Sequence, residues 1–216
     1  VTSENNVQPT IKDRIRAARG GLKFDFLDRL FGVAVNTVDI EGSKGLDIIG
    51  ASDKGDANLT RTLGDPQFTK FNLRIQRLQR ITPSINVLLA GRGQYSRDAL
   101  LSSEEFGLGG ISTVRGYEPS ETVGDRGIAG KVEVQWNNPS REVQLYSFLD
   151  SGTVWNEDAN NSNQKRNSLS SAGIGVRLDL PMDVNAEFIA AQPLNRDIQS
   201  RGNRDPQFFF SLNKKF

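Results

Sequence analysis

The stretch Ile128-Ala129-Gly130-Lys131-Val132-Glu133-Val134-Gln135-Trp136 alternates in polarity from one residue to the next. A period of two is that of a β-strand, whose successive side chains point to opposite faces. Similar alternation recurs along the chain and predicts an all-β fold. About nine strands are expected: one that ends near Phe26, then 33–45, 68–81, 85–95, 128–136, 143–150, 172–180, 184–190 and 208–216.

The connections between these strands sort by length. Long polar loops are expected at 50–66, 96–126, 156–167 and 192–205, and short turns at 29–32, 82–84, 138–141 and 181–183. Long loops on one rim and short turns on the other are typical of a transmembrane antiparallel up-and-down β-barrel. A soluble β-sandwich, which also alternates, is the alternative. Bacterial barrels have even strand numbers, so nine strands suggest a missing N-terminal part or a miscounted first strand.

Composition excludes several classes of function. The chain has 216 residues and a net charge of +1, which gives no strong field to attract nucleic acid. It has no cysteine and no histidine, so thiol or imidazole metal sites and histidine-based nucleophile systems are impossible. We expect no cofactor. The polar start at Val1 is no signal peptide, which predicts either a removed leader or an internal piece of a longer protein.

The central stretch from Phe106 to Tyr117 contains four glycines in twelve residues. Glycine at this density weakens both helix and strand, so no regular element is expected here. Apolar residues between the glycines argue against disorder. We therefore interpret the stretch as an ordered loop folded back onto the rest of the chain, with an ordinary surface loop as the alternative.

Several motifs, in order and spacing, resemble the outer-membrane transporters of two-partner secretion, the hemolysin secretion/activation family within the superfamily of polypeptide-transporting barrels. The motifs are Gly45-Leu46-Asp47-Ile48-Ile49-Gly50-Ala51-Ser52, the run from Leu101 to Gly110 leading into Val114-Arg115-Gly116-Tyr117, Phe148-Leu149-Asp150-Ser151-Gly152, and the ending from Asp205 to Phe216. The resemblance covers nearly the whole chain.

The resemblance implies a sixteen-stranded barrel in the bacterial outer membrane, preceded by two periplasmic POTRA domains. Residues 1–216 would form the C-terminal part of that barrel, without the POTRA domains and the first strands, and residues of about 98–126 would fold into its lumen. The implied function is export of a large unfolded exoprotein of the hemolysin or adhesin type. The implied partners are that exoprotein, the lipid bilayer and the outer-membrane assembly machinery, and the implied protein is not an enzyme.

The resemblance also assigns roles to residues. Val114, Arg115, Gly116 and Tyr117 form the lumen-loop motif, and its arginine is expected to meet Asp150 of the strand motif Phe148, Asp150 and Gly152. The alternation supports this pairing, because Asp150 has the parity opposite to Leu145 and Leu149 and so faces the polar lumen. The ending Phe208, Phe210, Leu212 and Phe216 is expected to be the assembly signal.

The sequence offers three other functions as alternatives. An assembly factor of the same superfamily, which inserts other membrane proteins, is the main alternative. An enzyme would need a site of carboxylates alone, and Glu104, Glu105 and Asp125 are the only suggestive acids; we expect them to be solvated. A phosphate site at Gly107–Gly110 is rejected because no helix follows the glycines.

Overall fold

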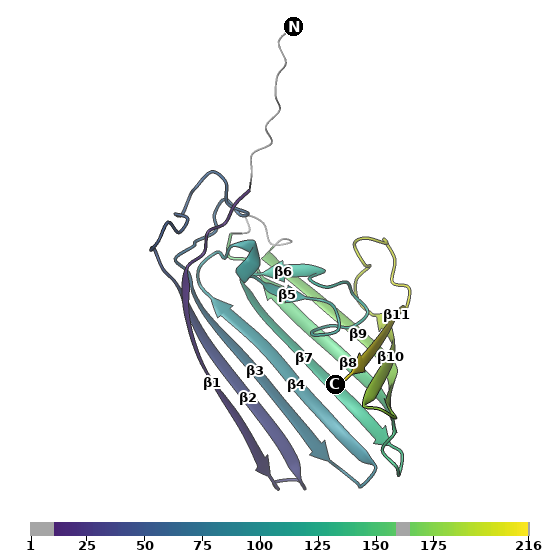
Figure 1. Cartoon of the computed structure of the whole chain (residues 1–216). Coiled ribbons are helices and arrows are strands. Elements are labelled where there is room, and N and C mark those ends of the chain that lie inside the picture. Colours follow the sequence, from purple (N-terminus) through teal and green to yellow (C-terminus); the bar gives the residue numbers. More distant parts are fainter. Residues whose placement is uncertain (1–10, 159–164, 216) are drawn as a thin grey trace.

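The computed structural model of the chain describes residues 11–158 and 165–215, and these form one antiparallel sheet with a loop against its concave face (Figure 1). The sheet has nine strands, and each is paired with its neighbours along the chain order, so that the first and last strands are the two edges. The strands are β1 (Ala17–Asp28), β2 (Ala34–Gly45), β3 (Thr69–Arg80), β4 (Ile85–Ser96), β7 (Arg126–Asn137), β8 (Val143–Trp155), β9 (Arg166–Leu180), β10 (Val184–Pro193) and β11 (Gln207–Lys214). The predicted up-and-down β-fold is confirmed.

The long connections and the short turns lie at opposite ends of the strands, as their lengths predicted (Figure 1). The turns are residues 29–33, 81–84, 138–142 and 181–183, and the longest connections are 46–68 and 97–125. We call residues 97–125, between β4 and β7, the central loop.

The prediction that the glycine-rich stretch contains no regular element is wrong. Within the central loop, η1 (Ser102–Glu104) is followed by β5 (Phe106–Leu108), which pairs with β6 (Thr122–Gly124). The chain turns directly after β5, where Gly109 and Gly110 have φ values of 116° and 79° that other residues rarely adopt. The glycines therefore set the conformation of the chain after β5, and they do not prevent β5 from pairing with β6.

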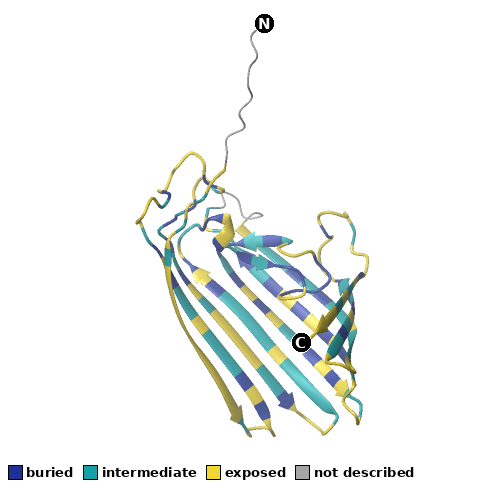
Figure 2. Cartoon of the chain, in the orientation of Figure 1, coloured by how far each residue is buried: buried dark blue, intermediate teal, exposed yellow. Residues whose placement is uncertain are grey.

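Residues of different exposure alternate along several strands (Figure 2), so the two faces of the sheet differ in exposure. Large apolar side chains of β7 to β9 are exposed on the convex face, which is the arrangement of a barrel wall in lipid. The alternation of polarity predicts that eight apolar residues of these strands lie on this face: Ile128, Val132, Val134, Trp136, Leu145, Leu149 and Ile174 are exposed there, and Val176 is half-buried. No helix in the described ranges combines the length and apolar character needed to span a membrane.

The apolar core lies between the central loop and the concave face. It joins Phe106, Leu108, Val114 and Tyr117 of the loop to side chains of the wall. The wall side chains are Ala129, Val154 and Leu169, joined by Ile198 from the segment between β10 and β11. The loop is thus packed against the sheet as part of the fold.

Candidate functional site

Arg115 is the central residue of the site. Its side chain is 2% exposed, although it stands in a connecting segment. Its Nε and Nη2 atoms donate to Oδ2 and Oδ1 of Asp150 on β8, at 2.7 Å each, and its backbone N donates to Oδ2 at 3.1 Å. This bidentate geometry matches the planar fork of arginine to a carboxylate, and lysine cannot reproduce it.

The remaining surface of the guanidinium is also occupied. Its Nη1 donates to Oε1 of Glu133 on β7 at 2.7 Å, and its Cζ lies 3.5 Å from the ring centroid of Phe148. A cation over an aromatic face is attracted by the ring quadrupole, and the attraction is stronger where water is excluded. Phe148 therefore covers a face of the guanidinium, and Asp150 binds its edge.

Glu133 extends the contact into a network along the concave face. Its Oε2 accepts from Nη2 of Arg177 at 3.2 Å, and Arg177 donates from Nε to Glu187 at 2.7 Å. Glu187 also accepts from the hydroxyl of Tyr146 at 2.8 Å. The alternating charges connect β7, β8, β9 and β10 beneath the loop tip.

The neighbours of Arg115 fix the loop tip. Tyr117 is 1% exposed, and its hydroxyl donates to Oδ1 of Asn195 at 3.0 Å. Val114 is fully buried in the core. Gly116 has φ of 89°, and a Cβ atom built there would lie 3.3 Å from the Cβ of Ala191 on β10. Glycine thus permits both the backbone conformation and the close approach to the wall.

Gly152 belongs to the same strand motif as Asp150, but its nearest neighbours are residues of β5 and β7. A Cβ atom at this position would lie 2.3 Å from Cδ1 of Leu108 and 2.9 Å from the carbonyl oxygen of Ile128. The space that Gly152 leaves is therefore filled by the leucine of β5. The glycine of the strand motif accommodates the hairpin, and the aspartate of the same motif holds the tip.

A second anchor holds the two ends of the central loop. Asp125 has no exposed surface and accepts from Nη1 of Arg61 and from the backbone N of Leu100, at 2.6 Å each. It also accepts from the backbone N of Glu157 at 2.7 Å. One carboxylate thus ties together four segments: the loop before β3, both ends of the central loop and the segment after β8.

The expectation that the acids of the loop are solvated is wrong. Glu104 is buried and contacts Nζ of Lys70 and Nη2 of Arg19, at 2.6 Å each. Glu105 accepts from Nη1 of Arg61 at 3.0 Å. Burial, together with the neighbouring charges of Asp125 and Asp158, raises the pKa of Glu105 to about 7 against the opposing effect of Arg61. Glu104 is thus an ion-pair partner that docks the loop, and Glu105 is buried beside Arg61.

The predicted assembly residues lie at the edge of the sheet. Phe208, Phe210 and Leu212 of β11 are all well exposed, on the parity of the convex face. The ring of Phe210 packs against that of Phe188 on β10, with centroids 4.6 Å apart. Phe216 lies outside the described residues.

The hydrogen bonds and ion pairs of the site hold the central loop against the sheet. In the described ranges no three acidic side chains gather in a way that could hold a metal ion.

The sequence alone did not identify Glu133, Arg177, Glu187 and Arg61 as partners. The inward parity of Glu133 and Arg177 was visible, but the register that brings them under Arg115 depends on how the strands pair.

Comparison with known proteins gives a consistent family. The model of the haemolysin secretion/activation protein family ShlB/FhaC/HecB matches residues 14–178. "Outer membrane transporter CdiB" of Dickeya dadantii (strain 3937) is 32% identical over 114 residues, which are 51% of this chain and 20% of that protein. The chain therefore spans about a fifth of the length of this relative.

Two solved structures share the fold. CdiB from Escherichia coli superposes with a TM-score of 0.72 at 20% identity, over 95% of this chain and 37% of that chain. BamA from Haemophilus ducreyi, solved without POTRA domains 1–3, has a TM-score of 0.66 at 17% identity, over 90% of this chain and 41% of that chain.

Proposed function

We propose, on the premise that the chain belongs to the haemolysin secretion/activation protein family ShlB/FhaC/HecB, that it builds part of an outer-membrane pore that exports a large partner polypeptide. The partner would cross as an unfolded exoprotein of the hemolysin or adhesin type. The nine strands would be the C-terminal part of a sixteen-stranded barrel, and the central loop would lie in its lumen.

The observation that carries this proposal is the fastening of the central loop on the concave face. Arg115 and Asp150 are 2% and 1% exposed, and each is engaged by the other in a bidentate contact. The convex face is apolar where the concave face is charged, as in a barrel that meets lipid outside and water inside. A loop that fills such a lumen can gate the passage of a chain.

The residues of the site favour transport over catalysis. Glu104, Glu105 and Asp125, the acids considered for catalysis, are each held by a cation, which favours a structural role for them. We infer that the energy for export comes from folding of the partner outside the cell, because no nucleotide site is expected.

The test uses cells that produce the intact transporter together with its partner exoprotein. Deleting the transporter should abolish the partner in the medium, leave other outer-membrane proteins at their normal levels, and be rescued by the wild-type gene. A general loss of outer-membrane proteins would instead support an assembly factor. Normal amounts of secreted partner without the transporter would overturn the proposal.

A further inference from the structure

Three cations on the concave face form a row beside the central loop. Arg74 of β3 and Arg92 of β4 lie directly opposite each other in the strand ladder. Lys131 of β7 lies in the next row, opposite Ala90 of β4. Like charges directly opposite each other on neighbouring strands are destabilising, so the arrangement needs an explanation.

The row differs from Lys70, Arg115 and Arg177, the cations that pack beneath the central loop, in having few acidic partners. Lys70, Arg115 and Arg177 each contact a carboxylate at 3.2 Å or less. Among the described residues, no carboxylate lies within ion-pair distance of Arg92 or Lys131. Arg74 reaches only Asp39, at 3.7 Å, and both side chains of this pair are more than one-third exposed.

The acids nearest to the row are already engaged. Asp150 and Glu133, whose charges act on Lys131, both accept hydrogen bonds from Arg115. Glu105, which lines a neighbouring cavity, contacts Arg61. Arg92 and Lys131 therefore have no ion-pair partner among the described residues while the loop is docked.

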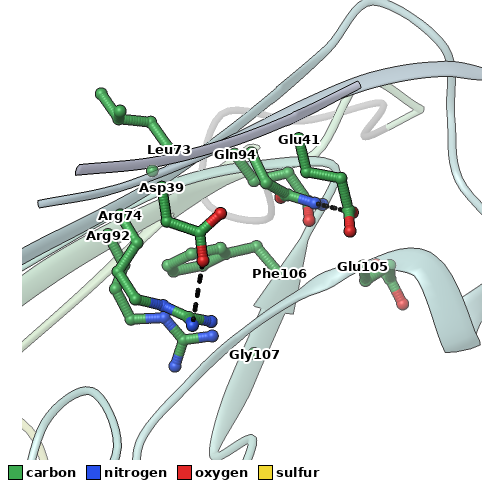
Figure 3. Close-up of a pocket in the computed structure, with 11 residues that line it drawn as sticks. Asp39, Glu41, Leu73, Arg74, Arg92, Gln94, Glu105, Phe106 and Gly107 are labelled. Carbon is green, nitrogen blue, oxygen red and sulfur yellow. Dashed lines mark hydrogen bonds and ion pairs between the residues drawn. The ribbon is translucent and has the colours of Figure 1, made fainter. Parts of the chain in front are cut away.

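A cavity of about 260 Å³ lies where the row meets the loop tip. It is lined by all three cations, by Gln76 on the wall, and by Ser112 and Thr113 of the loop, and none of its lining residues is acidic. An adjoining cavity of about 210 Å³ shares the two arginines (Figure 3). Figure 3 shows Asp39 reaching Arg74 from one side, while Arg92 has no such contact.

We propose that this row is an anion-binding site that takes a carboxylate side chain of the exported polypeptide. The inference rests on the proposed function for its occupant and on the row alone for its chemistry. The cavity is smaller than the roughly 300 Å³ at which small-molecule pockets begin, so it suits one acidic side chain. Two guanidinium forks and an ammonium offer donors only, which selects an ionised acceptor.

The experiment measures binding of a fluorescent peptide of alternating Asp and Ser to the purified intact transporter at low ionic strength. The twin peptide with Asn for Asp controls for charge. The variant carrying Arg92→Gln and Lys131→Gln removes the two unpaired cations. Arg80→Gln is the matched control, because Arg80 lies on the same strand and face as Arg74 but does not line the cavity.

We expect the acidic peptide to bind about tenfold or more tightly than its twin, and the double variant to lose that margin, which corresponds to ~1.4 kcal/mol. Arg80→Gln should bind as the wild type does. Equal binding of the two peptides, or unchanged binding by a double variant that is still a folded barrel, would overturn the inference. If the transporter bound inorganic sulfate but did not bind the acidic peptide, the exported chain would be overturned as the occupant of the site.

Export of the partner separates this inference from the proposed function. A wild-type protein that binds the acidic peptide but exports nothing would contradict the proposed function and leave the anion site standing. A double variant that no longer binds the peptide should export its partner more slowly. Normal export by that variant would show that the exported chain does not use the row.

Discussion

Arg115 and Asp150, 35 positions apart in the chain, meet through two parallel hydrogen bonds of 2.7 Å beneath a loop that excludes water from both. A pair in a wet lumen would be worth ~0–1 kcal/mol, but removing one partner of a buried pair costs ~3–5 kcal/mol because the other charge stays buried. Because the pair is buried, the larger cost applies, and we infer that this contact holds the loop in place.

The first prediction concerns this pair. Arg115→Ala leaves Asp150 and Glu133 without their shared cation, whereas Asp150→Ala leaves Arg115 its contact with Glu133. We expect both variants of the intact transporter to reduce export of the partner or alter gating with the barrel still inserted, and Arg115→Ala to be the more severe. Arg201→Ala, in an exposed loop, is the control.

The double variant distinguishes one interaction from two separate roles. If both single changes remove the same fastening, the double variant should be no worse than the more severe single variant. Losses that add fully would mean that the two residues act independently, and the fastening would be ruled out.

The second prediction concerns Asp125, which receives hydrogen bonds from Arg61, Leu100 and Glu157. Asp125→Asn keeps the shape but removes the charge and turns one acceptor into a donor that faces other donors. We expect a local loss of ~3–5 kcal/mol, seen as faster hydrogen exchange at the amide of Leu100. Asp47→Asn, in an exposed position, should leave exchange unchanged; unchanged exchange in Asp125→Asn would contradict the anchor.

Sequence reasoning reached the strands because their pattern is local. The stretch from Ile128 to Trp136 carries its own period, and burial on the two sides of β7 follows it. The turns followed from polar runs for the same reason. The hairpin of β5 and β6 was missed because Gly107 pairs with Val123, sixteen positions away, and strand propensity does not detect such a partner.

The ion pairs of the site could be predicted only in part. The inward parity of Asp150 indicated where its carboxylate points, and the motif supplied Arg115. The other ion pairs depend on how distant segments of the chain come together. Arg61 and Asp125 are 64 positions apart, and nothing local to either residue indicates their contact. Polarity near the short turns also departs from the pattern, since Arg77 and Asp28 form an ion pair on the convex parity.

The third prediction concerns the two faces of the wall. Spin labels at Val134, Leu149 and Ile174 in the intact transporter should be accessible to oxygen dissolved in lipid, because these side chains are exposed on the convex face. Labels at Ala90 and Lys131, on the concave face, should be shielded. Equal accessibility of the two sets would contradict a barrel wall in lipid.

The fourth prediction concerns the last strand. Phe208, Phe210 and Leu212 present an exposed apolar row that continues in the parity of Phe216. We propose that the assembly machinery recognises this row, and we therefore expect deletion of Phe216 to lower the amount of protein in the outer membrane without changing its synthesis. Phe31→Ala, which changes an exposed aromatic residue in a turn, is the control. Unchanged levels after the deletion would leave Phe216 a role in the aromatic girdle only.

The last prediction concerns Glu105, whose raised pKa of about 7 makes docking of the central loop depend on pH. Below about pH 4.5, the carboxyl is protonated whether the loop is docked or released, and Glu105 has no effect. Between that pH and 7, the docked state binds more protons, so the stability of docking falls as pH rises. Above pH 7 both states are ionised, and the loss, up to ~3 kcal/mol, is complete.

Release of the loop should therefore become more frequent between pH 5 and pH 8 through Glu105. Single-channel recordings of the intact transporter should show more open time at pH 8 than at pH 5, and Glu105→Gln should keep the low-pH behaviour at both. Glu142→Gln, in the short turn after β7, is the matched control. A Glu105→Gln variant with the pH response of the wild type would place the titrating group elsewhere.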